Sequence, residues 1–230
     1  MQSCSNQTAE LKNAEDVYFV AKTDNFAVTG DGSNPNWEKA TWLALPQHRP
    51  HEIDHSRATK VKVLYSQTGI YCLFDCFDKK ITATMESDFM NLWTEDVVEV
   101  FFWTDEAIPA YLEYEISPLN YELAILVTTL EGTQYRWQPF HYAENRRTRK
   151  ATSVRGGEKK HDAEITGWMA EFFIPYTLFY PLQNVPPKSG TQWRANFYRM
   201  DYDDIRISWS WRVMEDCFHE YFRFGTLLFE

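Results

Sequence analysis

Three acidic residues in two neighbouring segments are the first group in this chain that could do chemistry. Glu99 lies in the segment 97–103, and Glu113 and Glu115 lie in the segment 111–117. Both segments have the composition and alternation of β-strands. If they pair as a hairpin, Glu99 lies near Glu115, with Glu113 on the same face. Like charges opposed across strands are destabilising, so the pattern requires a compensating group.

Several kinds of group could offset the repulsion between these three glutamates. A cation such as Arg194 or Arg199 could neutralise the carboxylates, and a Ca²⁺ ion could bind their oxygens. One carboxyl group could be protonated, as in the acid/base pair of a glycoside hydrolase. Sugar hydroxyls could donate hydrogen bonds to them. The plainest alternative is a solvated face balanced by arginine.

Aromatic residues are dense in two places. Trp93 directly precedes the segment 97–103, where its ring can project from the end of a sheet. Near the C-terminus, six ring-bearing residues fall within fifteen positions: Trp209, Trp211, Phe218, His219, Tyr221 and Phe222. One strand cannot bury so many rings, so some should be exposed. An exposed ring flanked by polar groups can hold the apolar face of a pyranose, whereas packing in the core is the structural alternative.

His219 is a candidate general base, or a haem ligand together with Met200 or Met214. A lone histidine is more often a structural group. The chain has no GxSxG, HExxH, P-loop or GxGxxG motif. The motifs therefore give no direct indication of an enzyme.

Composition excludes several classes of protein. The 230 residues carry 23 Lys and Arg against 33 Asp and Glu, a net charge of −10, which argues against a general nucleic-acid binder. Hydrophobic residues make up 44 %, so the chain is not disordered. No apolar run approaches the roughly 20 residues of a membrane-spanning helix. The aromatic share of 17 % favours strands.

Many short strands separated by turn signals predict an all-β fold, an antiparallel β-sandwich of immunoglobulin-like or jelly-roll type with few short helices. The expected strands are residues 17–21, 26–28, 60–65, 70–77, 97–103, 111–117, 122–129, 168–174, 193–200, 207–211 and 225–229. Residues 46–58 and the charged stretch 144–162 are expected to be loops. No linker divides the chain, so residues 15–230 are expected to form a single domain.

Cysteine is sparse, and its four residues form no CxxC pair, so a zinc site of the usual spacing is not expected. Cys72 and Cys76 are expected to be buried thiols, because four residues along a strand separate them too far for a disulfide. Residues 1–14 are expected to form a flexible tail without signal-peptide features. Cys4, followed by Ser, Asn and Gln, fits either the start of a mature bacterial lipoprotein or an ordinary polar tail.

Taken together, these segments resemble family 9 carbohydrate-binding modules, in particular the stand-alone form of Bacteroides-like bacteria. The matches run in order over almost the whole chain. They are Asp31-Gly with Trp37 and Ala40, Lys60-Val-Lys-Val-Leu-Tyr, Gly69-Ile-Tyr, Trp93-Thr-Glu-Asp-Val-Val-Glu-Val-Phe, Gly167-Trp-Met-Ala-Glu-Phe-Phe-Ile-Pro, Trp193-Arg-Ala-Asn, Ser208-Trp-Ser and Phe218-His with Phe224-Gly-Thr-Leu. The segment that begins at Trp93 is the most specific of these.

The resemblance implies a β-sandwich that binds the end of a glycan between two aromatic rings. By position these rings are Trp93 and Phe218, where Phe218 replaces the usual Trp of the family. Glu99 matches a family residue that accepts hydrogen bonds from sugar hydroxyls, and Asn196 matches the asparagine of the late strand.

Other positions depart from the family or extend the expected site. Glu115 stands where the best-understood members have Arg, which puts their recognition of the reducing end in doubt. Arg199 is then expected to neutralise the carboxylates, and His219 to line the rim. Members of the family often hold structural Ca²⁺, although no ligands can be assigned here.

The sequence therefore predicts a non-catalytic module that binds an oligo- or polysaccharide, needs no cofactor and supports polysaccharide capture or degradation, with glycoside hydrolases as partners. The expected location is extracytoplasmic, either periplasmic, secreted or lipid-anchored, in a Gram-negative bacterium. Three rival hypotheses are a glycoside hydrolase that uses two of the three glutamates, a haem-binding sandwich domain, and a surface adhesin.

Overall fold

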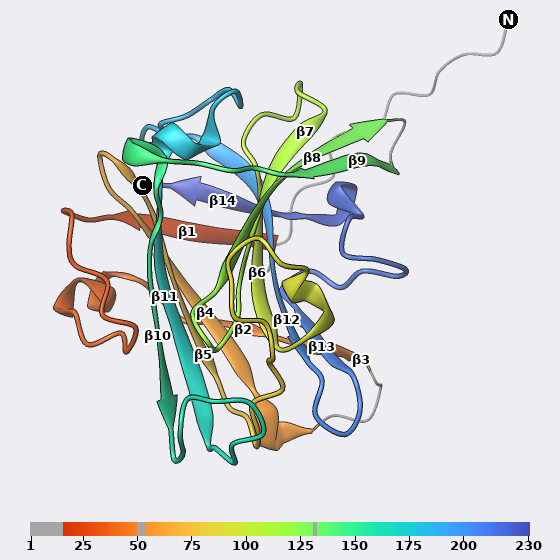
Figure 1. Cartoon of the computed structure of the whole chain (residues 1–230). Helices are drawn as coiled ribbons and strands as arrows, with labels where there is room; N and C mark the ends of the chain where they lie inside the picture. Colours follow the sequence, from red (N-terminus) through yellow and green to blue (C-terminus); the bar gives the residue numbers. More distant parts are fainter. Residues whose placement is uncertain (1–15, 50–53, 131–132) are drawn as a thin grey trace, which may run out of the picture.

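The computed structural model describes residues 16–49, 54–130 and 133–230 (Figure 1). The expected tail over residues 1–14, with Cys4, lies outside the described residues. Within these ranges, no helix is both long enough and apolar enough to cross a membrane. The helical segments described are short 3-10 helices.

Strands make up nearly all of the regular structure. They are β1 (Val17–Lys22), β2 (Leu43–Leu45), β3 (Gln47–Arg49), β4 (Thr59–Tyr65), β5 (Gly69–Cys76), β6 (Val97–Trp103), β7 (Ala110–Ile116), β8 (Glu122–Leu130), β9 (Thr133–Pro139), β10 (Arg149–Arg155), β11 (Gly167–Pro175), β12 (Gln192–Asp201), β13 (Ile207–Ser210) and β14 (Gly225–Phe229). The 3-10 helices are η2 (Pro35–Lys39), η3 (His55–Arg57), η4 (Leu92–Thr94), η5 (Glu144–Arg146), η6 (Tyr176–Phe179) and η7 (Tyr221–Arg223).

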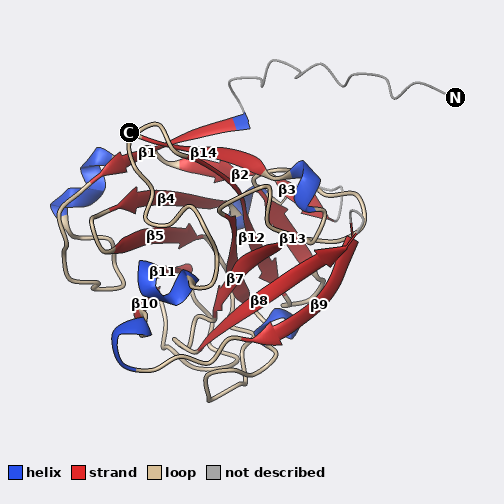
Figure 2. Ribbon diagram, turned by 90° about the horizontal axis from the view of Figure 1, so that it is seen from above, coloured by secondary structure: helices blue, strands red, loops and turns tan. Residues whose placement is uncertain are grey.

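The strands form one continuous hydrogen-bonded sheet that curls into two facing layers (Figure 2). Its order is β10-β11-β5-β4-β1-β14-β12-β6-β7-β8-β9. Strand β1 joins the layers, because it pairs in parallel with β14 in one layer and with β4 in the other. The other strand pairs are antiparallel. This confirms the predicted all-β sandwich, with the pairings of β1 as its two parallel exceptions.

The main hydrophobic core fills the space between the layers. Strand alternation sends Val98, Val100 and Phe102 from β6 into it, against Phe74 of β5 and Phe172 of β11. Cys72 and Cys76 belong to the same core, as expected of buried thiols. Apolar clusters also cover the outer faces of both layers. The central strands are therefore buried on both faces, which explains why they read as nearly continuous apolar runs.

On the outer face of the first layer, the loop between β1 and β2 is held by a buried carboxylate. Glu171 of β11 accepts hydrogen bonds from the Trp37 indole (3.0 Å) and from the backbone N–H of Gly30 (2.7 Å). Gly30 has a φ of +87° and packs against Ala151, so a side chain would not fit there. Gly32 of the Asp31-Gly motif also donates its backbone N–H to Glu171 (3.4 Å), so this motif and Trp37 have a structural role.

Several segments differ from the sequence prediction. Residues 47–49, inside the stretch 46–58 that was expected to be a loop, form β3, and residues 43–45 form the unexpected β2. Residues 149–155, expected to be loop, form β10, which pairs with β11 at the end of the sheet, and residues 133–139 form the unexpected β9. Both strands lie at the two ends of the sheet order, where many side chains face solvent and apolar alternation is weak. Residues 26–28 are not a strand, because their apolar side chains pack under the loop.

Candidate functional site

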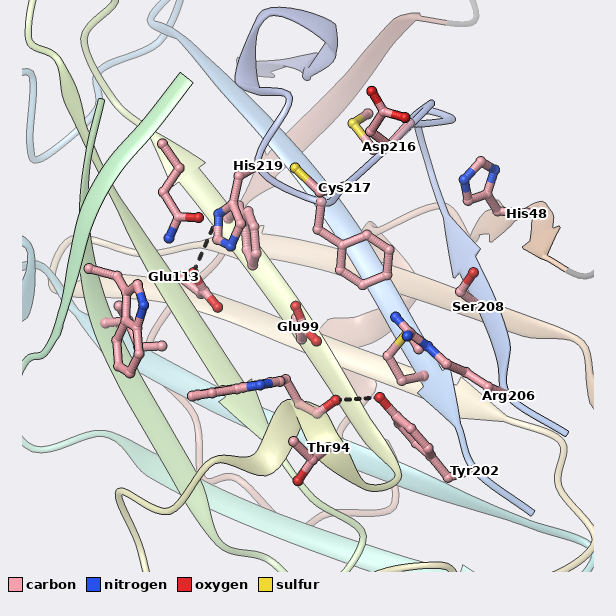
Figure 3. Close-up of a pocket in the computed structure, with 18 residues that line it drawn as sticks. His48, Thr94, Glu99, Glu113, Tyr202, Arg206, Ser208, Asp216, Cys217 and His219 are labelled. Carbon is pink, nitrogen blue, oxygen red and sulfur yellow. Dashed lines mark hydrogen bonds and ion pairs between the residues drawn. The ribbon is translucent and has the colours of Figure 1, made fainter. Parts of the chain in front are cut away.

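A cavity of about 580 Å³ opens on the outer face of the second layer (Figure 3). Its size is in the usual range for small-molecule sites. Strands β6, β7, β8 and β12 supply its floor, while η4, β9 and the C-terminal loop, here residues 211–224, supply its walls. Among the residues lining it are Trp93, Glu99, Glu113, Trp137, Arg206, Phe218 and His219.

The predicted carboxylate cluster forms the floor of this cavity. Glu99 is paired with Glu115 across β6 and β7, and Phe101 with Glu113, so all three carboxylates share one face. Their exposed fractions are only 2 % for Glu99, 4 % for Glu113 and 0 % for Glu115. Glu99 and Glu113 line the cavity, whereas the predicted ligand residue Glu115 is not among its lining residues.

The cluster is short of partners. Both carboxylate oxygens of Glu115 and one of Glu113 are buried with no hydrogen bond among the described residues other than the one that Glu113 and Glu115 form with each other when one of them is protonated. Burial raises the pKa of Glu113 to about 7. Burial, and then the charges of Glu99 and Glu113, raise the pKa of Glu115 well above its usual value. Burial and the charge of Glu113 do the same for Glu99.

The expected neutralising arginine lies elsewhere. Arg199 is paired with Val98, one position out of phase with Glu99, so its side chain enters the space between the layers. There its guanidinium binds Asp78 (2.8 Å) and Asp201 (2.9 Å). The cation beside the cluster is Arg206, whose charge opposes the rise in the pKa of Glu99. Figure 3 shows Glu99 between Glu113 and Arg206.

His219 stands beside the cluster as a neutral ring. Its Nδ1 lies 2.6 Å from the Tyr111 hydroxyl and 4.0 Å from a carboxylate oxygen of Glu113. Burial lowers the pKa of His219 to about 4, so it supplies no positive charge at neutral pH. Met200 and Met214, the other residues of the haem hypothesis, also line the cavity.

Aromatic rings line the walls of the cavity. Trp93 meets Trp137 edge to face, with centroids 5.3 Å apart, and Trp137 is 46 % exposed. Phe218 stacks on Tyr198 at 4.1 Å, which fixes the plane of its ring. The structure thus brings both predicted stacking residues, Trp93 and Phe218, to one cavity with Glu99 and His219.

Asn196 does not line the cavity but fastens its wall. It is fully buried, and its amide nitrogen donates to the Tyr198 hydroxyl (2.8 Å) and to the Arg212 carbonyl (2.9 Å). Its amide oxygen accepts from the N–H of Arg212 (2.9 Å). Tyr198 in turn donates to the Phe218 carbonyl (2.7 Å). Asn196 therefore positions the loop that carries Phe218.

Sequence reasoning missed several residues of the cavity. Trp137 lies in β9, which was not predicted because the polar residues around Trp137 do not give an apolar alternation pattern. Arg206 lies in a short turn between β12 and β13, whose position beside Glu99 depends on the folded sheet. Tyr202 donates to the Trp93 carbonyl (2.7 Å) and so anchors η4. None of these positions carries a local signal.

One group of carboxylates within the described ranges is compact enough for a metal ion: Asp78, Asp201 and Asp203. Its oxygens already bind guanidinium groups, since Arg57 contacts Asp201 (2.8 Å) and Asp203 (3.4 Å), and Arg199 contacts Asp78. A Ca²⁺ ion would have to displace both arginines to gain oxygen ligands. This group therefore does not fit the structural Ca²⁺ that the family resemblance suggested.

Comparison with known proteins agrees with this architecture. A crystal structure of a candidate carbohydrate-binding protein from Bacteroides uniformis is similar with a TM-score of 0.77 and 17 % identity, over 93 % of this chain and 99 % of that one. A family 9 carbohydrate-binding module from Caldicellulosiruptor kristjanssonii, in complex with cellotriose, is similar with a TM-score of 0.63 and 15 % identity, over 93 % of each chain. The glucose complex from the same organism gives 0.63 and 14 %, over 93 % and 95 %.

A curated sequence relative is an extracellular protein of Arthroderma benhamiae, 30 % identical over 147 residues. The match covers 61 % of this chain and 62 % of that protein's length. The model of the carbohydrate family 9 binding domain-like family matches residues 28–227, which is most of the chain. This chain therefore belongs to the carbohydrate family 9 binding domain-like family.

Proposed function

We propose that the protein is a non-catalytic module that binds an oligo- or polysaccharide in the cavity on its outer face. The observation that carries the proposal is the meeting of aromatic rings and carboxylates in that cavity. Trp93, Trp137 and Phe218 supply flat apolar surface, and Glu99 and Glu113 supply acceptors for sugar hydroxyls. This pairing matches the two kinds of surface that a pyranose presents.

The relatives support the same proposal. The similar solved structures from Caldicellulosiruptor kristjanssonii are of a family 9 module in complex with cellotriose and with glucose. The Arthroderma benhamiae relative is an extracellular protein, which supports an extracytoplasmic location for this chain. In such a place the module would capture polysaccharide, alongside glycoside hydrolases that degrade it. Affinity in the millimolar to micromolar range, roughly −4 to −8 kcal/mol, is reasonable for such an open site.

Tryptophan fluorescence titration with gluco-, xylo- and amino-oligosaccharides tests the proposal. We expect a saturable change with at least one sugar class, and its loss in Trp93→Ala while the circular dichroism spectrum stays that of the wild type. Trp42→Ala is the matched control, because Trp42 lies among Lys60 and Lys62 on the other layer. It should bind as the wild type does.

Two results would contradict the proposal. If Trp93→Ala unfolds, Trp93 is a core residue and the assigned site is wrong. If the protein releases sugar from chromogenic glycosides, and Glu113→Gln stops the release, the glutamates are catalytic and the module is an enzyme.

A further inference from the structure

The carboxyl groups at the cavity floor are ones whose ionised form a cation would favour, because burial raises the pKa of Glu99, Glu113 and Glu115. Glu99, Glu113 and Glu115 are all more than nine-tenths buried, and among the described residues three of their oxygens have no hydrogen bond except the one between Glu113 and Glu115 themselves. Asp216 lines the same cavity. A buried carboxylate without partners is costly, so the fold holds these groups in place at the expense of stability. Such an arrangement favours a ligand that supplies positive charge.

The cations near the cavity within the described part of the chain do not meet this need. Arg206 is exposed and acts on Glu99, with its guanidinium 5.8 Å from the Tyr202 ring centroid. His219 beside Glu113 is neutral, and its Nδ1 is already engaged by Tyr111. Arg199 lies on the other face of the sheet. Among the residues that the structure describes, Glu113 and Glu115 therefore keep no cationic partner of their own at the cavity floor.

The cation that fits is organic rather than a metal ion. The glutamate oxygens do not form a compact ligand set, since the described residues hold one such set and it is Asp78, Asp201 and Asp203. The walls of the cavity are aromatic rings, which suit the apolar face of a sugar. An ammonium group has three donors and matches carboxylate acceptors that lack hydrogen bonds.

We infer that the cavity selects an amino sugar, a hexosamine whose free ammonium group binds Glu113 and Glu99 while its ring packs on Trp93 and Phe218. This inference rests on the proposed function and names the ligand class of the same site. The N-acetylated sugar lacks the charge, and the neutral sugar offers only a hydroxyl. The discrimination therefore comes from one charge-assisted contact in a place from which water is largely excluded.

The test compares three β-1,4-linked trimers that differ only at C2: the glucosamine trimer, cellotriose and the N-acetylglucosamine trimer. Titration calorimetry with the whole chain should show the glucosamine trimer binding at least about tenfold more tightly than the other two. Glu113→Gln should remove most of this preference. Glu158→Gln, an exposed change in the loop after β10, keeps the same net charge as Glu113→Gln and should leave the preference intact.

A second readout does not depend on the affinities. A bound ammonium favours the ionised carboxylate, so binding of the glucosamine trimer at about pH 6.5 should release a proton from Glu113. Buffers of different ionisation enthalpy would show it in the apparent binding heat. Cellotriose should release none. Glu99→Gln gives an independent variant if Glu113→Gln does not fold.

The outcomes separate the inference from the proposed function. If cellotriose or the N-acetylglucosamine trimer binds as tightly as the glucosamine trimer, the amino-sugar inference fails and glycan binding stands. If lysine or a simple diamine binds as tightly as the glucosamine trimer, the site recognises the ammonium group without the sugar ring, and the inference also fails. If no sugar binds to folded protein, both proposals fail.

Discussion

At the scale of single residues, Glu113 makes folding depend on pH. Burial raises its pKa from 4.5 to about 7, so the folded state holds a proton that the unfolded state releases. The resulting stability is complete below about pH 4.5 and is lost as the pH rises to about 7. The neighbouring carboxylates of Glu99 and Glu115 act in the same direction.

We therefore expect Glu113→Gln to stabilise the ligand-free protein above pH 7, by on the order of 3 kcal/mol. The reason is that glutamine keeps the shape of the side chain and cannot become a buried charge. Urea unfolding at several pH values, for both proteins, would measure the difference. The gain should shrink toward zero near pH 4.5.

His219 changes the pH dependence of stability in the direction opposite to Glu113. The contribution of Glu113 must therefore be measured as the difference between the wild type and Glu113→Gln. Burial lowers the pKa of His219 from 6.5 to about 4, so its contribution is present above pH 6.5 and is lost as the pH falls toward 4. The two groups partly cancel in the wild type. The difference between the wild type and Glu113→Gln isolates the carboxyl group. An equal gain at pH 4.5 and pH 8 would show that packing, rather than ionisation, explains it.

At the scale of elements, β12 organises both faces of the second layer. Tyr198 and Met200 face the cavity side, while Arg199 between them faces the other layer. Asn196, two residues before Tyr198, fastens the C-terminal loop by bonds to both backbone groups of Arg212. One strand thus fixes the wall that carries Phe218 and His219.

Asn196→Ala should loosen that loop. Its removal leaves the N–H and carbonyl of Arg212 and the Tyr198 hydroxyl without their buried partner, at a cost of about 1–3 kcal/mol. We expect lower stability, faster hydrogen exchange confined to residues 212–220, and weaker sugar binding. Tyr198→Phe is the comparison variant: it keeps the ring beneath Phe218 and the bonds of Asn196 to Arg212 but loses the bond to the Phe218 carbonyl, so it should speed exchange in the loop less than Asn196→Ala does. Unchanged exchange in the loop would mean that Asn196 does not position it.

The features that could be predicted from the sequence are those that depend on the alternation of side chains along a strand. The register that opposes Glu99 to Glu115 followed from alternation within two apolar strands, and the structure confirms it. Trp137 was not predicted, because β9 lies at the end of the sheet order. Its exposed positions carry polar residues, so the strand lacks the apolar alternation by which the other strands were recognised. Arg199 was assigned to the wrong face of the sheet. Adjacent residues of a strand point to opposite faces, and because Tyr198 is paired with Glu99, Arg199 must point away from the glutamates.

At the scale of the whole molecule, a buried charged network connects the two layers at one end. Arg199 of β12 reaches across to the Phe77 carbonyl (2.7 Å) and the Thr59 hydroxyl (3.0 Å), which belong to the first layer. Asp78 also accepts from the Trp168 indole (3.1 Å). Guanidinium groups form close ion pairs with the carboxylates here, whereas the described residues show no arginine ion pair to the carboxylates at the cavity floor.

This contrast leads to a prediction about metal ions. Because Arg57 and Arg199 already neutralise Asp78, Asp201 and Asp203, we expect EDTA and added Ca²⁺ to leave the melting temperature unchanged. Arg199→Met should destabilise the protein by about 3–5 kcal/mol, since it leaves buried carboxylates unpaired. Thermal melts of the wild type with EDTA or Ca²⁺ test the first expectation, and urea unfolding of the variant tests the second.

A saturable rise in melting temperature with Ca²⁺ would contradict this account, because a ligand that binds the folded state stabilises it by mass action. Repeating the melt with Arg199→Met would then locate the ion. In that variant, freed carboxylates of Asp78 and Asp201 become available as ligands, so Ca²⁺ should stabilise it even if the wild type does not respond. Such a gain in the variant alone would show that the arginines occupy the place of a metal ion and tie the two layers together in its stead.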